Sequence, residues 1–142
     1  MVDWTKSLTE LEGKDWGPPS YPSYLVTTCH QLRHKALREL TPEELRIAIG
    51  QQMSLAILVP LALRQLRADP WVEGDYFEGD LLQSVLAVQA IFWKEQPDLW
   101  REANKIASAA WTTAERRSLS WRKAVQPGLL AAYATFQQRR PG

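Results

Sequence analysis

Apolar residues recur along most of the chain at three- and four-residue steps, the spacing that places side chains on one face of an α-helix. The first such stretch begins near Ser20 or Ser23 and runs to about Leu40. Alternation between apolar and polar residues, the pattern of a half-buried strand, is lacking, and β-branched residues are few and scattered. The pattern therefore predicts an all-α fold.

The clearest helix start is marked by a capping sequence. Thr41 suits the N-cap, Pro42 suits the first helical position, and Glu44 completes a capping box with Thr41. Within this helix, Gly50 indicates either close packing by a neighbour or the approach of the helix end. Ser54 is then predicted to cap a second, more apolar helix that is central to the core.

Proline, glycine and aspartate divide the rest of the chain into further helices. The breaks and starts lie at Asp69-Pro70, Asp80, Pro97 and Pro127-Gly128, the last before a helix from Leu129 to about Gln138. We expect a compact single-domain bundle of about five to seven helices over residues 1–142. It would comprise an irregular N-terminal arm (1–19), a helical core (20–107) and a basic C-terminal helical extension (108–142).

The composition is that of an ordinary globular protein, with 45% apolar and 23% charged residues. A single cysteine, Cys29, excludes an intramolecular disulfide, and 142 residues can bury a core without one. No signal peptide is evident, and the longest apolar run, Leu55–Leu63, is about half the length that spans a bilayer. We therefore expect a cytoplasmic protein that does not bind membranes.

Charge is unevenly distributed along the chain, although the net charge is only +1. Residues 1–107 carry 11 basic and 15 acidic residues, whereas the C-terminal extension carries six basic residues and one acidic residue. The basic residues of the extension form either a solvated helix face, a second contact surface, or an electrostatic clasp onto the acidic loop described below.

Candidate catalytic and metal-binding patterns are incomplete. Cys29, His30 and His34 are the only cysteine and histidine residues, too few for a closed four-ligand zinc site. The only Glu-x-Lys, at residues 12–14, has no apolar strand around it, as a metal-dependent nuclease would need. Gly-x-Ser-x-Gly and phosphate-binding Gly-x-x-x-x-Gly-Lys do not occur. The sequence predicts no catalytic residue, no metal and no cofactor, and a protein that is not an enzyme.

Residues 69–80, the acidic loop, are the most distinctive segment, because five carboxylates lie within twelve residues and no basic residue accompanies them. One interpretation is a solvated turn. The other is recognition of a basic partner, since carboxylates steer a cationic protein and aromatic rings supply binding anchors. The predicted contact residues are Trp71, Glu73, Asp75, Tyr76, Phe77, Glu78 and Asp80.

Four blocks of sequence together carry a family resemblance. They are SLTELEGKDWG near the start, LVTTCHQLRHKALRELTPEELRIAIGQQMSLAILVPLALRQL in the middle, and EGDYFEGDLLQSVL followed by FWKEQPDLW. In order and spacing these blocks resemble the helical immunity proteins of bacterial contact-dependent growth inhibition (CDI) systems, over about residues 7–103. The chain departs from the family pattern at Ser54, where glycine is favoured, and at Glu78, where proline is common.

The resemblance implies a cytoplasmic antidote without catalysis of its own. Such a protein binds and blocks the toxic C-terminal domain of a CDI surface effector, which is often a nuclease. We therefore predict a monomer that occludes a basic toxin domain in a 1:1 complex, without binding nucleic acid directly. The alternative is a helical nucleic-acid-binding or regulatory scaffold that uses residues 116–140, with Trp121 as a stacking platform.

Overall fold

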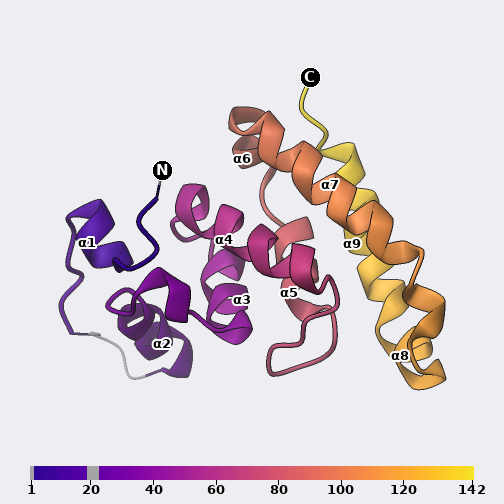
Figure 1. Cartoon of the computed structure of the whole chain (residues 1–142), viewed down its shortest axis with the longest axis horizontal. Coiled ribbons are helices and arrows are strands. Elements are labelled where there is room, and N and C mark those ends of the chain that lie inside the picture. Colours follow the sequence, from indigo (N-terminus) through magenta and orange to yellow (C-terminus); the bar gives the residue numbers. More distant parts are fainter. Residues whose placement is uncertain (1, 19–22) are drawn as a thin grey trace.

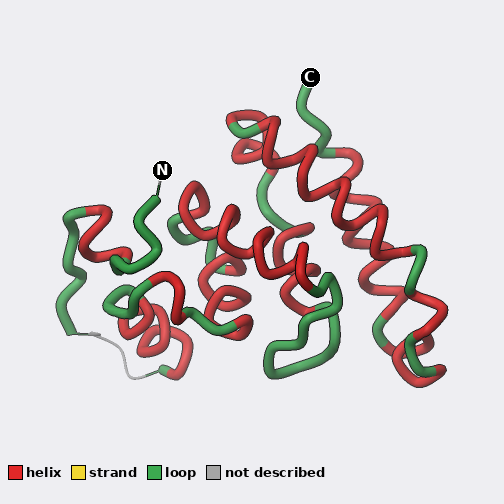
Figure 2. The backbone as a smooth tube through the Cα atoms, viewed as in Figure 1, coloured by secondary structure: helices red, strands yellow, loops and turns green. Residues whose placement is uncertain are grey.

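The computed structural model describes residues 2–18 and 23–142, and its regular structure is helical (Figure 1, Figure 2). Among these residues there is no strand, only an isolated bridge between Glu73 and Glu78. Six of the nine described α-helices have seven or more residues, which confirms the predicted all-α fold. The helices are α1 (Leu8–Glu12), α2 (Tyr24–Leu32), α3 (Pro42–Gly50), α4 (Leu55–Ala68), α5 (Asp80–Leu86), α6 (Ala90–Glu95), α7 (Pro97–Trp111), α8 (Leu119–Ala124) and α9 (Gln126–Gln138), with 3-10 turns η1 (Leu37–Glu39) and η2 (Ala114–Arg116).

Helix α3 begins as the sequence predicts. The Thr41 hydroxyl accepts a hydrogen bond from the backbone N–H of Glu44 at 3.1 Å, and the Glu44 carboxylate accepts one from the Thr41 N–H at 3.0 Å. Both are orphan donors of the first helical turn, so the box satisfies them locally. The helix ends at Gly50, where an added Cβ would meet nothing within 4 Å. Of the two explanations for Gly50, the helix end is therefore the correct one.

The predicted helix from Ser23 to Leu40 is too long. Ser23 does cap α2, but α2 ends at Leu32, and Ser20 lies outside the described residues. The backbone N–H groups of Leu37 and Arg38 donate to carbonyl oxygens of the N-terminal arm at Lys6 and Trp4, both at 2.9 Å. Because those donors are taken by a distant segment, an uninterrupted α-helix cannot use them.

The N-terminal arm is less irregular than predicted, because it contains α1. Ser7 and Glu10 form a second capping box, and Gly13 ends the helix at a φ of +67°. Leu8 is fully buried, so this short helix is anchored in the core. The sequence signal was available, since Ser-x-x-Glu at residues 7–10 is the capping-box pattern.

Ser54 does not cap α4 as predicted. Its backbone is left-handed, with φ +48° and ψ +42°, and its side chain makes no cap hydrogen bond. The hydroxyl instead donates to the Glu12 carboxylate at 2.8 Å, which links α4 to the end of α1. A left-handed backbone favours glycine, the residue that the family resemblance leads us to expect at this position.

Helix α4 is the centre of the bundle, as predicted, and contacts α3, α5 and α7. Its inner face contributes fully buried side chains, Leu58, Val59, Ala62 and Leu66. Helices α7 and α9 lie beyond it (Figure 1), where the rings of Trp100 and Phe136 stack at a centroid distance of 4.9 Å. Helix α9 begins at Gln126 rather than Leu129, because a proline in the first turn removes only an orphan donor. No described helix is long and apolar enough to cross a bilayer.

Candidate functional site

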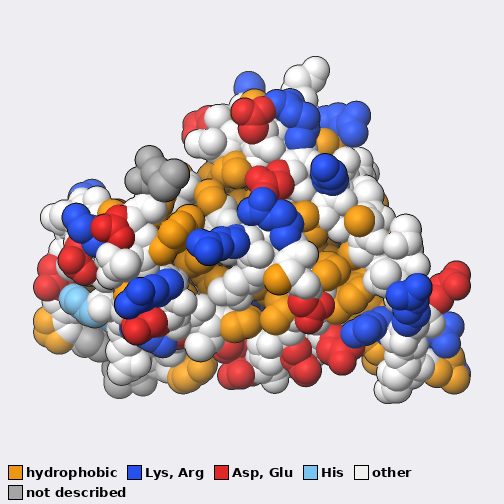
Figure 3. All heavy atoms as spheres, in the orientation of Figure 1, with side chains coloured by type: hydrophobic (Ala, Val, Ile, Leu, Met, Phe, Trp, Pro, Cys, Tyr) orange, Lys and Arg blue, Asp and Glu red, His pale blue; other side chains and the backbone are white. Residues whose placement is uncertain are grey.

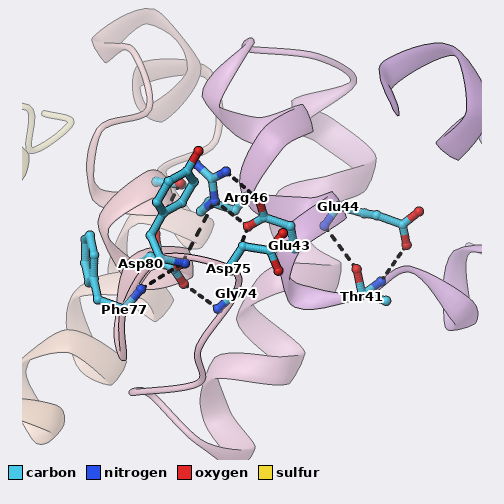
Figure 4. Close-up of polar contacts among 10 residues, drawn as sticks. Thr41, Glu43, Glu44, Arg46, Gly74, Asp75, Phe77 and Asp80 are labelled. Carbon is cyan, nitrogen blue, oxygen red and sulfur yellow. Dashed lines mark hydrogen bonds and ion pairs between the residues drawn. The ribbon is translucent and has the colours of Figure 1, made fainter. Parts of the chain in front are cut away.

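The acidic loop joins α4 to α5 and is folded around one buried carboxylate. Asp80 is only 3% exposed, and it accepts hydrogen bonds from the backbone N–H of Gly74 at 2.7 Å, Tyr76 at 3.1 Å and Phe77 at 3.4 Å (Figure 4). The N-cap of α5 is Gly79, so Asp80 is the first helical residue and not the predicted cap. Its carboxylate fixes the loop backbone instead.

A second carboxylate supports the loop from α3. Glu43 accepts a hydrogen bond from the Asp75 N–H at 3.1 Å and a bidentate pair from Arg46 at 2.6 and 2.7 Å (Figure 4). The Arg46 hydrogen bonds hold the pKa of the Glu43 carboxyl below its ordinary value of 4.5. Arg46 also lies 4.0 Å from the Asp80 carboxylate and 4.5 Å from the centroid of the exposed Tyr76 ring. The loop therefore has a counter-ion, although no basic residue lies within residues 69–80.

Close packing at Gly74 lets these two carboxylates meet the loop. An added Cβ would lie 2.6 Å from the Glu43 carboxylate and 3.0 Å from that of Asp80. The first distance is too short for a carbon atom and the second is a tight contact, so a larger residue would displace the Glu43 carboxylate and press on that of Asp80. Glycine at this position is needed for close approach and not for a turn.

The C-terminal extension holds the other end of the loop. Arg117 pairs with the Glu78 carboxylate at 2.9 Å, and the Trp121 indole N–H donates to the Glu78 backbone carbonyl at 2.8 Å. Of the three alternatives considered for the basic residues of the extension, the electrostatic clasp is thus present as one ion pair. Two other basic residues of the extension lie elsewhere. Arg139 donates to the backbone carbonyls of Ala87 and Val88, just after α5, and Arg140 lies over the Trp100 ring.

Tryptophan packing changes two sequence predictions. Trp71 is 4% exposed; its indole N–H donates to the Thr113 hydroxyl at 2.9 Å, and its ring meets Trp111 and Trp121 edge to face. Trp71 is therefore a packing residue and not the exposed anchor predicted from the loop sequence. Trp121 is also buried, which removes the predicted stacking platform for nucleic acid.

Five of the seven predicted contact residues share the outer surface of the loop. Glu73, Asp75 and Tyr76 are exposed, Tyr76 by 70%, and Phe77 and Glu78 are partly exposed. Acidic side chains gather along the lower edge of the molecule in Figure 3, where the loop lies in Figure 1. Trp71 and Asp80 are not part of this surface. The support that Glu43 and Arg46 give to the loop was not predicted from the sequence. Their three-residue spacing on a helix is the only sequence signal that they form a pair.

The Cys29, His30 and His34 group has ordinary structural surroundings. Burial raises the pKa of the Cys29 thiol, and a His30 ring nitrogen lies 3.0 Å from the Gly17 carbonyl oxygen. His34 is exposed and lies 3.7 Å from the Asp15 carboxylate. Within residues 2–18 and 23–142, no three histidine, cysteine, aspartate or glutamate side chains gather as a metal site.

Comparison with known proteins gives a family. A family model described as CDI immunity proteins matches residues 10–103, which is more than half of the chain. No curated protein and no solved structure matches the chain. The matched residues include the acidic loop, Glu43 and Arg46, whereas Arg117 and Trp121 lie beyond them. Proteins of this family are toxin inhibitors and not enzymes. The chain belongs to the family of CDI immunity proteins.

Proposed function

We propose that this protein neutralises the toxin domain of its cognate CDI effector by binding it one-to-one, in the cytoplasm, through the outer surface of the acidic loop. The toxin is a nuclease, and the loop covers its basic active-site cleft. One observation carries the proposal: Glu73, Asp75 and Tyr76 are exposed on a backbone that is fixed from inside by Asp80 and Glu43.

Rigidity supports this assignment. A loop that is already ordered loses little conformational entropy on binding, so more of its contact energy contributes to affinity. Tyr76 is held over Arg46 while 70% of its surface stays exposed, an arrangement suited to a binding anchor. The ring can therefore contact a partner without first being ordered.

Charge supports the choice of partner. Glu73 and Asp75 are exposed, and a negatively charged surface raises the association rate for a cationic protein. Nucleases that bind a phosphate backbone present lysine and arginine side chains to it. Carboxylates on a rigid loop are a chemical substitute for those phosphates.

The test is charge reversal at the outer surface, with Glu73→Lys and Asp75→Lys combined. At low salt we expect the association rate with the purified toxin domain to fall about tenfold, and less at high salt, because steering is screened. The matched control is Glu95→Lys with Asp98→Lys, two exposed acids at the end of α6 and the start of α7; α6 lies at the top of the view in Figure 1, and the loop lies at the bottom. An affinity within threefold of the unaltered protein would show that the toxin binds elsewhere.

A further inference from the structure

The acidic loop is held from two sides by different parts of the chain. Asp80 and Glu43, inside the matched family region, bind the backbone of residues 74–77. Arg117 and Trp121, outside the matched region, bind Glu78 through its carboxylate and its backbone carbonyl. The C-terminal extension thus supplies the ion pair and the indole hydrogen bond that hold Glu78.

Glu78 lies at the C-terminal end of the outer surface of the loop. It follows Phe77 directly, pairs with Glu73 across an isolated β-bridge, and precedes Gly79, whose φ is +95°. A shallow hollow of about 500 Å³ separates this part of the loop from α8, with Glu73, Tyr76 and Phe77 on one wall and Arg116 and Ser120 on the other. Movement of Glu78 would therefore change both the loop surface and the width of the hollow.

The Arg117 ion pair contributes little to folding. Its side chains are 30% and 46% exposed, and half-exposed pairs of this kind contribute little to stability. A large loss of binding on breaking it could not be explained by unfolding. The pair and the indole hydrogen bond are suited to a different task, which is to select one arrangement of the loop.

We propose that Arg117 and Trp121 are positioning residues for toxin recognition, which act through Glu78 to set the geometry of the outer surface. This inference rests on the proposed function of the acidic loop. In the complex, the Glu78 carboxylate stays with Arg117, and the toxin contacts its neighbours. The C-terminal extension would then adapt a loop of the matched family region to the toxin of this particular chain.

The test is a charge-swap cycle with Glu78→Arg, Arg117→Glu and the two combined. Dissociation constants are measured with the cognate toxin domain at about 0.5 M salt, where long-range steering is screened. We expect each single variant to bind about tenfold more weakly and the swapped pair to recover to within threefold of the unaltered protein. The swap conserves net charge, and Arg122→Glu, an exposed position on α8 that does not line the hollow, is the matched control.

A second readout does not depend on the toxin. In Arg117→Glu, and in Trp121→Phe, which removes the indole donor together with part of the buried ring, we expect amide hydrogen exchange at Tyr76, Phe77 and Gly79 to become at least fivefold faster. The swapped pair should restore slow exchange. Thermal melting of the Glu78 and Arg117 variants should stay within a few degrees of the unaltered protein, because that ion pair is partly exposed, and this separates positioning from unfolding.

The outcomes distinguish the inference from the proposed function. If the swapped pair binds as weakly as Glu78→Arg while loop charge reversal also weakens binding, Glu78 contacts the toxin directly and the positioning inference is wrong. If Arg117→Glu leaves both binding and exchange unchanged, the inference is also wrong. If Glu73→Lys with Asp75→Lys has no effect, the proposed toxin-binding surface itself is wrong.

Discussion

Carboxylates lie both beneath the acidic loop and on its outer surface, which we call its inner and outer layers. Those of the inner layer are hydrogen-bonded to the loop backbone, and those of the outer layer are exposed. The inner carboxylates, Asp80 and Glu43, accept hydrogen bonds from four loop N–H groups and lie near Arg46. The outer carboxylates, Glu73 and Asp75, are exposed, and no ion pair is found for either among the described residues. The inner layer is suited to holding the backbone and the outer layer to meeting a partner.

This difference shows why charge counted along a sequence overstates the field at a surface. Five carboxylates occur within residues 69–80, yet Asp80 is buried near Arg46 and Glu78 is paired with Arg117. Both counter-ions come from distant parts of the chain. The negative charge available to a partner is therefore that of Asp69, at the start of the loop, and of Glu73 and Asp75 on its outer surface.

The largest effect is expected at the inner layer, with Asp80→Asn. An asparagine amide would direct its NH₂ group at the N–H of Gly74 or at those of Tyr76 and Phe77, so at least one buried donor would lose its acceptor. We expect the free energy of unfolding to fall by about 3 kcal/mol. Urea denaturation at neutral pH measures this loss.

The control for Asp80→Asn is Asp98→Asn, whose side chain is 91% exposed at the start of α7. That variant should change the free energy of unfolding by less than about 0.5 kcal/mol. Equal effects of the two substitutions would contradict the division of the carboxylates into an inner and an outer layer.

A smaller effect, with a defined pH dependence, is expected for Glu43→Gln. The folded state lowers the pKa of Glu43, chiefly through the Arg46 hydrogen bonds. Its contribution is therefore fully present above 4.5, the ordinary value, and is lost as pH falls through the lower pKa of the folded state. At pH 7 we expect glutamine to cost about 1–2 kcal/mol, since a bidentate charged pair becomes a neutral contact.

The difference between Glu43→Gln and the unaltered protein should narrow below pH 4.5, because the unaltered side chain then becomes protonated as well. Urea midpoints at a series of pH values measure it. Glu95→Gln, at an exposed position on α6, serves as the comparison. A constant offset for Glu43→Gln would show that the Arg46 pair does not stabilise the loop.

Features encoded within one helical turn were predictable from sequence. The Thr41–Glu44 box starts α3 as expected, and the same Ser-x-x-Glu signal marks α1 at Ser7. Long-range contacts were not predictable. The end of α2 depends on backbone carbonyls of Lys6 and Trp4, about thirty residues earlier in the chain. Local propensity contains no information about such a partner.

The sequence predicted which residues make up the candidate site but not which of them are buried. Periodicity identified a loop of acids and aromatics, yet it could not assign Trp71 and Asp80 to the interior or bring Arg46 beneath Tyr76. Ser54 shows the same limit for the backbone, because its left-handed conformation is fixed by the junction of α3 and α4 and not by serine itself. Side-chain direction in a loop depends on tertiary packing, which sequence spacing does not specify.

The smallest effect on stability is expected at the outer layer, and it is the sharpest test of the comparison. Glu73→Gln with Asp75→Asn removes two charges while keeping both side-chain shapes. Because these carboxylates are exposed, we expect the free energy of unfolding to change by less than about 0.5 kcal/mol. Any change should favour the variant, since like charges near each other repel. If instead urea denaturation shows a loss of unfolding free energy near that of Asp80→Asn, the outer carboxylates also stabilise the fold, and the distinction between inner and outer carboxylates is wrong.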